Sequence, residues 1–66
     1  MFMKLTVVSC VYDDKNRTIS ETYSDGFSYE RIYDDDWDMY IPAHVIEYEH
    51  GKKVYERHYN DEVYYK

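Results

Sequence analysis

The sequence has few of the residues from which small proteins usually build or crosslink a core. Its 66 residues include one leucine, one proline, two glycines and one cysteine. A single cysteine excludes an internal disulfide, and the apolar or small neighbours of Cys10 indicate a buried structural thiol in a reducing compartment. Because four isoleucines and six valines complete a short aliphatic inventory, aromatic rings must supply much of the core.

The chain also has no apolar run that could cross a membrane. The apolar stretch at residues 1–11 is too short and too polar for this, and it has no pattern of a cleavage site. At this length the chain is expected to form a single domain spanning residues 1–66. We therefore expect a soluble, cytoplasmic protein.

No catalytic, nucleotide or metal motif is present. The acidic run at residues 34–38 lacks the alternating ligands and the glycine of a calcium loop. The three histidines, His44, His50 and His58, are too few and too scattered for a zinc site, and the predicted hairpin places His44 and His58 on opposite faces. Cys10 lies in the middle of a predicted strand, where a nucleophile seldom occurs. The sequence predicts no enzyme, no metal site and no cofactor.

Negative charge and tyrosine are what the chain has in abundance: 14 Asp and Glu against 8 Lys and Arg, a net charge of −6, and 10 tyrosines. The net charge lies entirely between Asp13 and Asp38, where nine acids meet three cations, while the two flanks together sum to zero. Such a field repels nucleic acid and attracts basic surfaces. We expect no direct binding of DNA or RNA.

Three strands joined by tight turns are predicted in the first half, at residues 4–12, 18–24 and 27–33. Apolar or small residues occur at both alternating positions of the first strand, which predicts a central strand covered on both faces. Asp25-Gly26 predicts a type I′ hairpin turn between the second strand and the third.

The second half, residues 43–59, is interpreted as a hairpin that turns at His50-Gly51. Charge pairing sets its register, with Glu49 opposite Lys52, Glu47 opposite Val54, Ile46 opposite Tyr55, and Val45 opposite Glu56. This register places the following residues on one face: His44, Ile46, Tyr48, Lys53, Tyr55, Arg57 and Tyr59. A rival interpretation begins a helix at Pro42 and ends it at Gly51. The tail at residues 61–66 is either a short final strand or a frayed end.

These patterns predict a mainly β fold, a small antiparallel meander of about four to five strands with an acidic loop. A β-rich α+β fold, with one short helix around residues 34–50, is the alternative.

Tyrosines among acidic residues are typical of a surface that binds a basic protein partner. In size and composition the chain is similar to the small acidic inhibitors that bacteriophages and mobile elements encode against host nucleases, repair enzymes, polymerases or restriction systems. This likeness is one of style, and no residue role is carried over from it. It implies a non-enzymatic inhibitor, a DNA mimic, that blocks a nucleic-acid-binding enzyme or regulator in the host cytoplasm. The candidate binding residues are Asp34, Asp35, Asp36, Trp37, Asp38, Asp13, Asp14, Asp25, Glu30, Tyr29, Tyr33 and Tyr40.

The alternative is a small antitoxin-like or regulatory module that binds a protein partner through a Tyr-rich face or a sheet edge. A tyrosine-rich face on so small a domain also makes a homodimer an open option.

Overall fold

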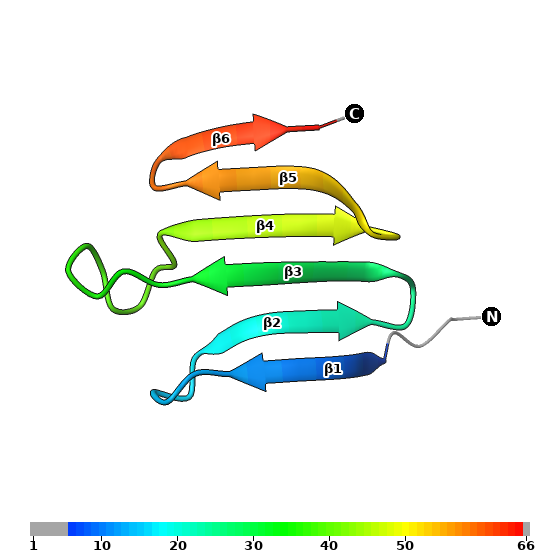
Figure 1. Ribbon diagram of the computed structural model, residues 1–66, viewed down its shortest axis with the longest axis horizontal. Coiled ribbons are helices and arrows are strands. Elements are labelled where there is room, and N and C mark those ends of the chain that lie inside the picture. The colour runs from blue at the N-terminus through cyan, green and yellow to red at the C-terminus, as the bar shows by residue number, and fades with distance from the viewer. Residues whose placement is uncertain (1–5, 66) are drawn as a thin grey trace.

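The computed structural model describes residues 6–65 and consists of one six-stranded antiparallel sheet (Figure 1). The order of the strands in the sheet is their order in the chain. The strands are β1 (Val7–Tyr12), β2 (Thr18–Tyr23), β3 (Phe27–Ile32), β4 (His44–Glu49), β5 (Lys52–His58) and β6 (Asp61–Tyr64). The mainly β meander is confirmed, with one strand more than the upper prediction and with the tail as a true strand. Residues 4 and 5 of the first predicted strand lie outside the described residues.

Both interpretations with a helix, at residues 42–51 or around residues 34–50, are wrong, because residues 34–43 form a loop and the segment that follows forms β4 and the turn to β5. His50 and Gly51 have φ values of 50° and 80°, the left-handed pair that a type I′ turn requires. At Asp25-Gly26 only the glycine has a positive φ, of 91°, so the predicted type I′ turn does not form there. The amide of Gly26 instead donates to the carbonyl of Tyr23 at 3.1 Å, which closes a three-residue loop.

The pairing of β4 with β5 departs from the predicted register by one residue. Glu49 lies opposite Lys52 as predicted, but a register shift between Glu47 and Tyr48 places Glu47 opposite Tyr55. The same shift moves Ile46, Val45 and His44 opposite Glu56, Arg57 and His58, respectively. A bulge inserts one residue into a strand without a fixed sequence signal, which is why charge pairing alone missed it.

This shift also corrects the predicted faces. Residues directly opposite each other in an antiparallel pair share a face, so His44 and His58 lie on the same face and not on opposite ones. Their rings contact each other, with centroids 5.0 Å apart. Tyr55 and Arg57 consequently lie on the other face from His44, Ile46 and Tyr48.

The first strand is an edge strand, and the prediction of a central, covered strand was wrong. β1 pairs only with β2, and Val8 is 67% exposed. Cys10, predicted to be buried, is half-buried. Apolar residues at both alternating positions here reflect a preference for the strand conformation and not coverage of both faces.

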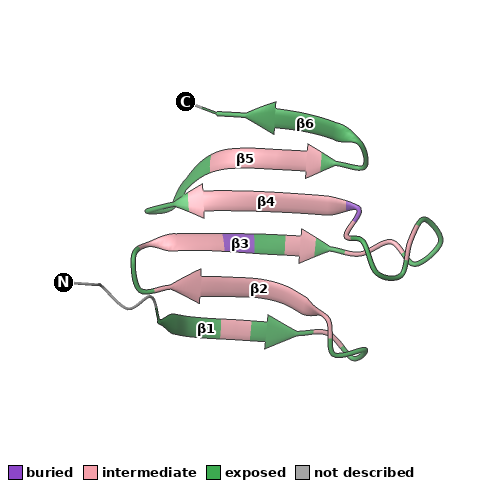
Figure 2. Cartoon of the chain, turned by 180° about the vertical axis from the view of Figure 1, so that it is seen from behind, coloured by how far each residue is buried: buried purple, intermediate pink, exposed green. Residues whose placement is uncertain are grey.

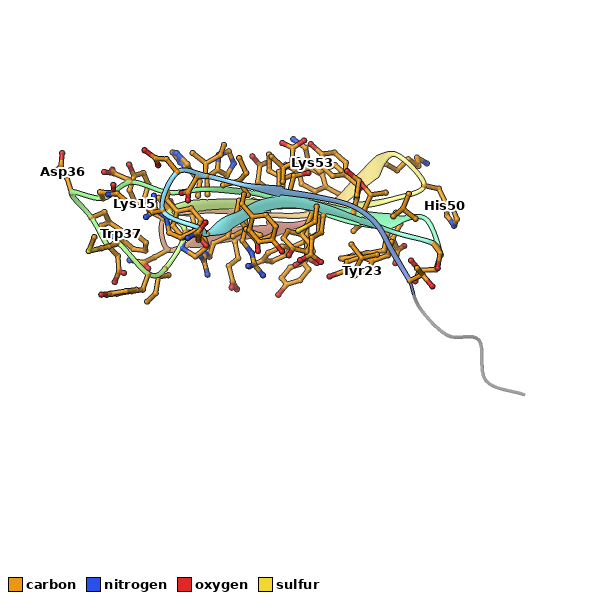
Figure 3. All side chains as sticks on the ribbon, turned by 90° about the horizontal axis from the view of Figure 1, so that it is seen from below. Lys15, Tyr23, Asp36, Trp37, His50 and Lys53 are labelled. Atoms are coloured by element: carbon orange, nitrogen blue, oxygen red, sulfur yellow. The ribbon has the colours of Figure 1, made fainter. Side chains whose placement is uncertain are left out.

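Within residues 6–65 the sheet is a single layer, and no other element of this range covers either face (Figure 3). The tyrosine face carries Tyr23, Phe27, Tyr29, Val45, Tyr55 and Tyr64, and the histidine face carries Ser20, Ser28, Ile46, Tyr48, His44 and His58. Tyr23 and Lys53, labelled in Figure 3, lie on opposite sides. Among residues 6–65 there is no helix that could span a membrane.

Burial is slight, and only Tyr29 and Ala43 are buried among the described residues (Figure 2). The ring of Tyr29 lies at the centre of the tyrosine face, with its centroid 6.3 Å from that of Tyr23. The guanidinium of Arg31 covers the Tyr29 ring at 4.4 Å. Burial raises the pKa of the Tyr29 hydroxyl well above its usual range. Tyr29 is therefore the centre of what core a single sheet provides.

Candidate functional site: the acidic end of the sheet

Three of the five connections leave the sheet at the same end, because consecutive strands of a meander run in opposite directions (Figure 1). We name residues 13–17, 33–43 and 59–61 the acidic end. It holds seven aspartates, opposed only by Lys15 and Arg17: Asp13, Asp14, Asp34, Asp35, Asp36, Asp38 and Asp61. The acidic end thus carries −5 of the net charge of −6.

The acidic loop, residues 33–43, is an ordered structure that its own aspartates build. The carbonyl oxygen of Asp34 accepts hydrogen bonds from the amides of Trp37 at 3.0 Å and Asp38 at 2.9 Å. The carboxylate of Asp34 accepts from the amide of Asp36 at 3.1 Å. Aspartate favours turns because its short side chain can satisfy nearby backbone donors in this way. The run that looked like a solvated charge cluster is thus also the framework of the loop.

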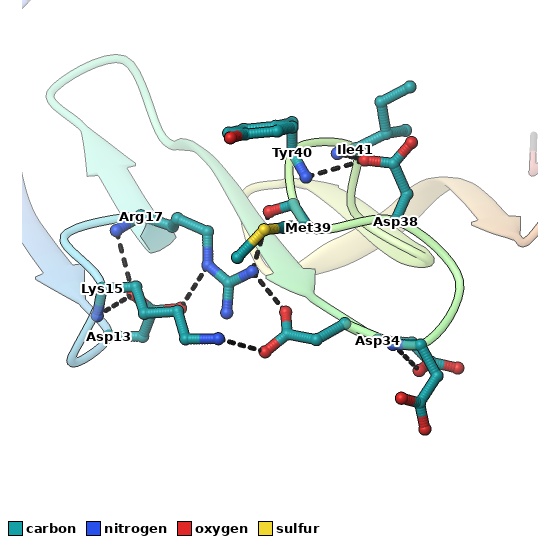
Figure 4. A network of polar contacts seen from close by, with 10 residues as sticks. Asp13, Lys15, Arg17, Asp34, Asp38, Met39, Tyr40 and Ile41 are labelled. Atoms are coloured by element: carbon teal, nitrogen blue, oxygen red, sulfur yellow. Dashed lines mark hydrogen bonds and ion pairs between the residues drawn. The ribbon is translucent and has the colours of Figure 1, made fainter.

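Arg17 fixes this loop to the turn between β1 and β2 (Figure 4). Its Nη1 donates to Asp35 Oδ1 at 2.6 Å and to the carbonyl oxygen of Met39 at 2.8 Å, while Nε donates to Asp13 Oδ2 at 2.7 Å. The guanidinium also covers the ring of Tyr33, at 4.2 Å from its centroid. A planar guanidinium can make several directed bonds at once, so Arg17 joins two connections that lie far apart in the sequence.

Lys15 completes this ionic cluster, with Nζ 2.5 Å from Asp35 Oδ2. Hydrogen bonds from Lys15 and Arg17 hold the pKa of Asp35 below its usual value. The pKa of Asp13 is likewise lowered, first by the hydrogen bond from the backbone amide of Arg17. Both carboxyl groups therefore stay ionised, but their charge is balanced within the protein.

Tyr59, in the third connection, braces the loop from the other side. Its hydroxyl donates to Asp34 Oδ2 at 2.9 Å, which raises the pKa of the Tyr59 hydroxyl. Its ring packs edge-on against Trp37, with centroids 5.4 Å apart. Tyr59 has a φ of 57°, which is an unfavourable backbone conformation for a bulky residue. These contacts, together with the bond from its amide to the Ala43 carbonyl at 2.6 Å, hold it there.

Beyond the aspartates the loop presents a run of three apolar residues to solvent. Met39, Tyr40 and Ile41 are 45%, 85% and 49% exposed. Their backbone is nevertheless fixed, because Asp38 Oδ1 accepts from the amides of Tyr40 at 2.7 Å and Ile41 at 2.9 Å. Consecutive exposed apolar residues beside a polar rim are typical of a binding surface. Sequence reasoning singled out Tyr40 but missed Met39 and Ile41, although their position directly after the acidic run was a usable signal.

Most of the candidate binding residues lie together, and three lie elsewhere. The acidic loop, Asp13, Asp14, Tyr33 and Tyr40 lie together at the acidic end. Three others do not join them: Asp25 lies in the turn at the opposite end, Glu30 is exposed on the histidine face, and Tyr29 is buried in the tyrosine face.

The carboxylates at the acidic end also differ in what they do. Those of Asp14 and Asp36 accept no hydrogen bond from any residue between 6 and 65, and both residues are exposed. Asp61, the first residue of β6, is likewise exposed, and its carboxylate accepts no hydrogen bond within this range. These three carboxylates are therefore the most available to a partner. Figure 3 shows Asp36 at the far tip of the loop.

A second polar cluster, which the sequence did not predict, lies on the histidine face around Glu56. Its Oε2 lies 2.7 Å from His44 Nε2, and its Oε1 accepts from the Tyr65 hydroxyl at 2.9 Å and from Lys53 Nζ at 3.2 Å. The hydrogen bond from His44, followed by those from Tyr65 and Lys53, lowers the pKa of Glu56 to about 2. Within residues 6–65, no group of three or more His, Cys, Asp or Glu side chains is placed to hold a metal ion.

The fold and the site together define a single-layer antiparallel meander with one acidic, apolar-tipped end. No protein-family model matches this chain, and neither a curated protein nor a solved structure matches it.

Proposed function

We propose that this protein is a non-enzymatic inhibitor of the phage or mobile-element type, which acts in the host cytoplasm by occupying the basic surface of a nucleic-acid-binding protein. The observation that supports this most directly is the gathering of seven aspartates, from three separate connections, at one end of the sheet. A surface that normally holds phosphates is attracted to such a concentration of carboxylates.

The free carboxylates and the apolar tip would contribute to binding in different ways. Asp14 and Asp36 are available for ion pairs with the partner, while Asp34, Asp35 and Asp38 keep the loop in shape and add to the field. Met39, Tyr40 and Ile41 supply apolar area that ion pairs alone do not, and aromatic residues often dominate binding energy at interfaces. Because the loop is already ordered by Arg17 and Tyr59, little conformational entropy is lost when it binds.

Charge-driven binding of this kind has two consequences for the complex. The affinity should fall as the salt concentration rises, because exposed charges are screened. Added DNA should displace the protein, because both would occupy the same cationic surface.

Capture of a partner from a bacterial lysate tests the proposal, with Asp36→Lys and Asp14→Lys as the informative variants. These two changes reverse charge without removing a hydrogen bond of the loop, whereas changes at Asp34, Asp35 or Asp38 would also disorder it. Glu30→Lys, on the exposed histidine face and away from the acidic end, makes the same charge change and serves as the control.

The expected result is a nucleic-acid-binding protein that the native chain and Glu30→Lys recover, that the other two variants lose, and that DNA elutes. A partner recovered equally well by every variant, and indifferent to salt and DNA, would show that the acidic end is only a solvated surface.

A second candidate function rests on the edge formed by β1. This strand has no charged residue in Val7–Tyr12, whereas the opposite edge, β6, begins with Asp61 and Glu62. Charged residues protect sheet edges from pairing, and an uncharged edge can accept a strand from another protein. A regulatory module that works in this way would lose its partner on Val8→Pro and keep it on Asp36→Lys, the reverse of the pattern expected for the inhibitor.

A further inference from the structure

The sheet lacks the second layer that a domain normally needs. Stable domains bury one face of a sheet against another sheet or against helices, and among residues 6–65 only Tyr29 and Ala43 are buried. A chain of this size buries little surface even when it is globular. Coverage of one face would supply the missing core.

The two halves of the tyrosine face differ. On its β2–β3 half, the ring centroid of Tyr23 lies 6.1 Å from that of Phe27 and 6.3 Å from that of Tyr29, which makes an aromatic cluster. On its β4–β6 half, a hollow of about 360 Å³ is lined by Glu47, Val54, Tyr55 and Tyr64. The aromatic cluster and the hollow therefore lie on different halves of the same face.

A two-fold axis that runs parallel to the strands and lies above the tyrosine face, over the boundary between β3 and β4, would bring these halves together. Rotation about it lays the β1–β3 half of one copy over the β4–β6 half of the other. The aromatic cluster of each copy then faces the hollow of its partner. Such a contact is isologous, because each copy contributes the same surface twice.

The charges of the tyrosine face are compatible with a second copy. By strand register this face carries four acids and three cations, namely Glu21, Glu47, Glu49, Glu62, Arg31, Lys52 and Arg57. Its net charge of −1 is smaller than the −5 of the acidic end, so two copies repel each other less through this face than through their acidic ends, and both signs are available for pairing.

The size of the face also suits a dimer. Six strands at about 4.8 Å spacing, each about 20 Å long, give a footprint on the order of 600 Å² before side-chain relief is added. A standard protein interface removes roughly 800 Å² of accessible surface from each partner.

We infer that the protein is a homodimer in which two copies pack their tyrosine faces together as a two-layer β-sandwich, with each Tyr23–Phe27–Tyr29 cluster over the hollow of the other copy. The contact through the tyrosine faces leaves both acidic ends exposed, and the axis places them side by side at one end of the sandwich.

Neighbouring residues of β6 give a matched test. Tyr64 lies on the tyrosine face and Val63 on the opposite one, and both are exposed in the single chain. Tyr64→Lys and Val63→Lys place the same charge on the same edge strand, one on each face. Sedimentation velocity over a wide range of concentration should show a dimer for the native chain and for Val63→Lys, and a monomer for Tyr64→Lys.

Each of the other outcomes overturns the proposal. Loss of the dimer in both variants indicates pairing through the β6 edge, and its loss only in Val63→Lys indicates the histidine face. A native chain that is monomeric at every concentration removes the dimer altogether.

Chemical acetylation of tyrosines in the native chain keeps the proposal testable even if Tyr64→Lys fails to fold. Tyr64 and Tyr40 are 73% and 85% exposed in the single chain, so both should react readily when the protein is dilute. Concentration should protect Tyr64 several-fold and leave Tyr40 reactive. Equal reactivity of the two residues at all concentrations would contradict the tyrosine-face dimer.

Discussion

The guanidinium of Arg17, in the turn between β1 and β2, donates to the carboxylate of Asp35 in the acidic loop at 2.6 Å. Arg17 is only 18% exposed, against 42% for Asp35. This contact and the bond from Arg17 to the Met39 carbonyl are what fix the exposed apolar tip to the sheet.

We predict that Arg17→Gln and Arg17→Lys both loosen the acidic loop, since a lysine keeps the charge but cannot make the same set of directed bonds. Amide hydrogen exchange at Tyr40 and Ile41 should accelerate roughly tenfold in either variant, because these protected amides lie in the segment that Arg17 holds. Lys52→Gln, at the start of β5 and at the opposite end of the sheet, is the control. Unchanged exchange in Arg17→Gln would mean that the aspartates order the loop without the arginine.

Protonation of the Glu56 carboxylate should destabilise the protein in acid. Its pKa is about 2 in the folded protein against an ordinary value of 4.5, so its ionised form stabilises the fold above the unfolded value. That contribution is lost as the pH falls from the unfolded pKa towards the folded one. Glu56→Gln should be less stable than the native chain near neutral pH and should lose less stability on acidification.

Denaturant unfolding at a series of pH values measures this difference, with Glu49→Gln as a control for the loss of an exposed carboxylate. If Glu56→Gln retained the full acid sensitivity of the native chain, its carboxylate could not be the group responsible. The lowered pKa values of Asp13 and Asp35 predict that part of the sensitivity persists in this variant.

Tyr29 should be the least replaceable side chain of the described sheet. It is 9% exposed and lies between the ring of Tyr23 and the guanidinium of Arg31. Tyr29→Ala should cost about 3–5 kcal/mol, as for other large aromatic truncations. Tyr29→Phe keeps the ring and should cost only about 1 kcal/mol. Comparable losses for the two variants, measured by denaturant unfolding, would place the importance of Tyr29 in its hydroxyl and not in its ring.

In the turn between β4 and β5, substitutions at two adjacent positions should change the stability of the protein in opposite directions. A Cβ at Gly51 would meet no atom within 4 Å, so Gly51→Ala should cost about 1–2 kcal/mol through its φ of 80° alone. His50→Asn should instead stabilise the protein, because asparagine is preferred at the first central position of a type I′ turn. Thermal unfolding of both variants checks the signs, and stabilisation by Gly51→Ala would rule out the left-handed turn.

The sequence predicted the elements of this fold better than their relationships. His50-Gly51, the strand segments and the acidic loop were readable because turn residues, β-branched residues and charge act locally. The position of β1 at an edge was not readable, since local preference does not say how many layers cover a strand. The shift between Glu47 and Tyr48, which moved His58 to the face of His44, had no local signal either.

The site was half predictable for the same reason. The acidic loop was predictable from its composition. Arg17 and Tyr59, however, lie 18 and 25 residues along the chain from their partners in the loop, Asp35 and Asp34. Only the return of the chain to the same end of the sheet brings them to the loop. That meeting depends on the number and direction of the strands, which composition does not specify.

The meander topology has a consequence for how this protein folds. Each strand pairs only with its neighbours in the chain, so most contacts are local and should form rapidly. The acidic loop is the longest connection. It is the covalent link between two three-stranded units, β1–β3 and β4–β6, which also pair through β3 and β4. Pairing β3 with β4 closes this loop, and it should carry the largest loop-closure entropy of the five connections. A partner bound to the loop would therefore hold β3 and β4 together and would slow the unfolding of both units.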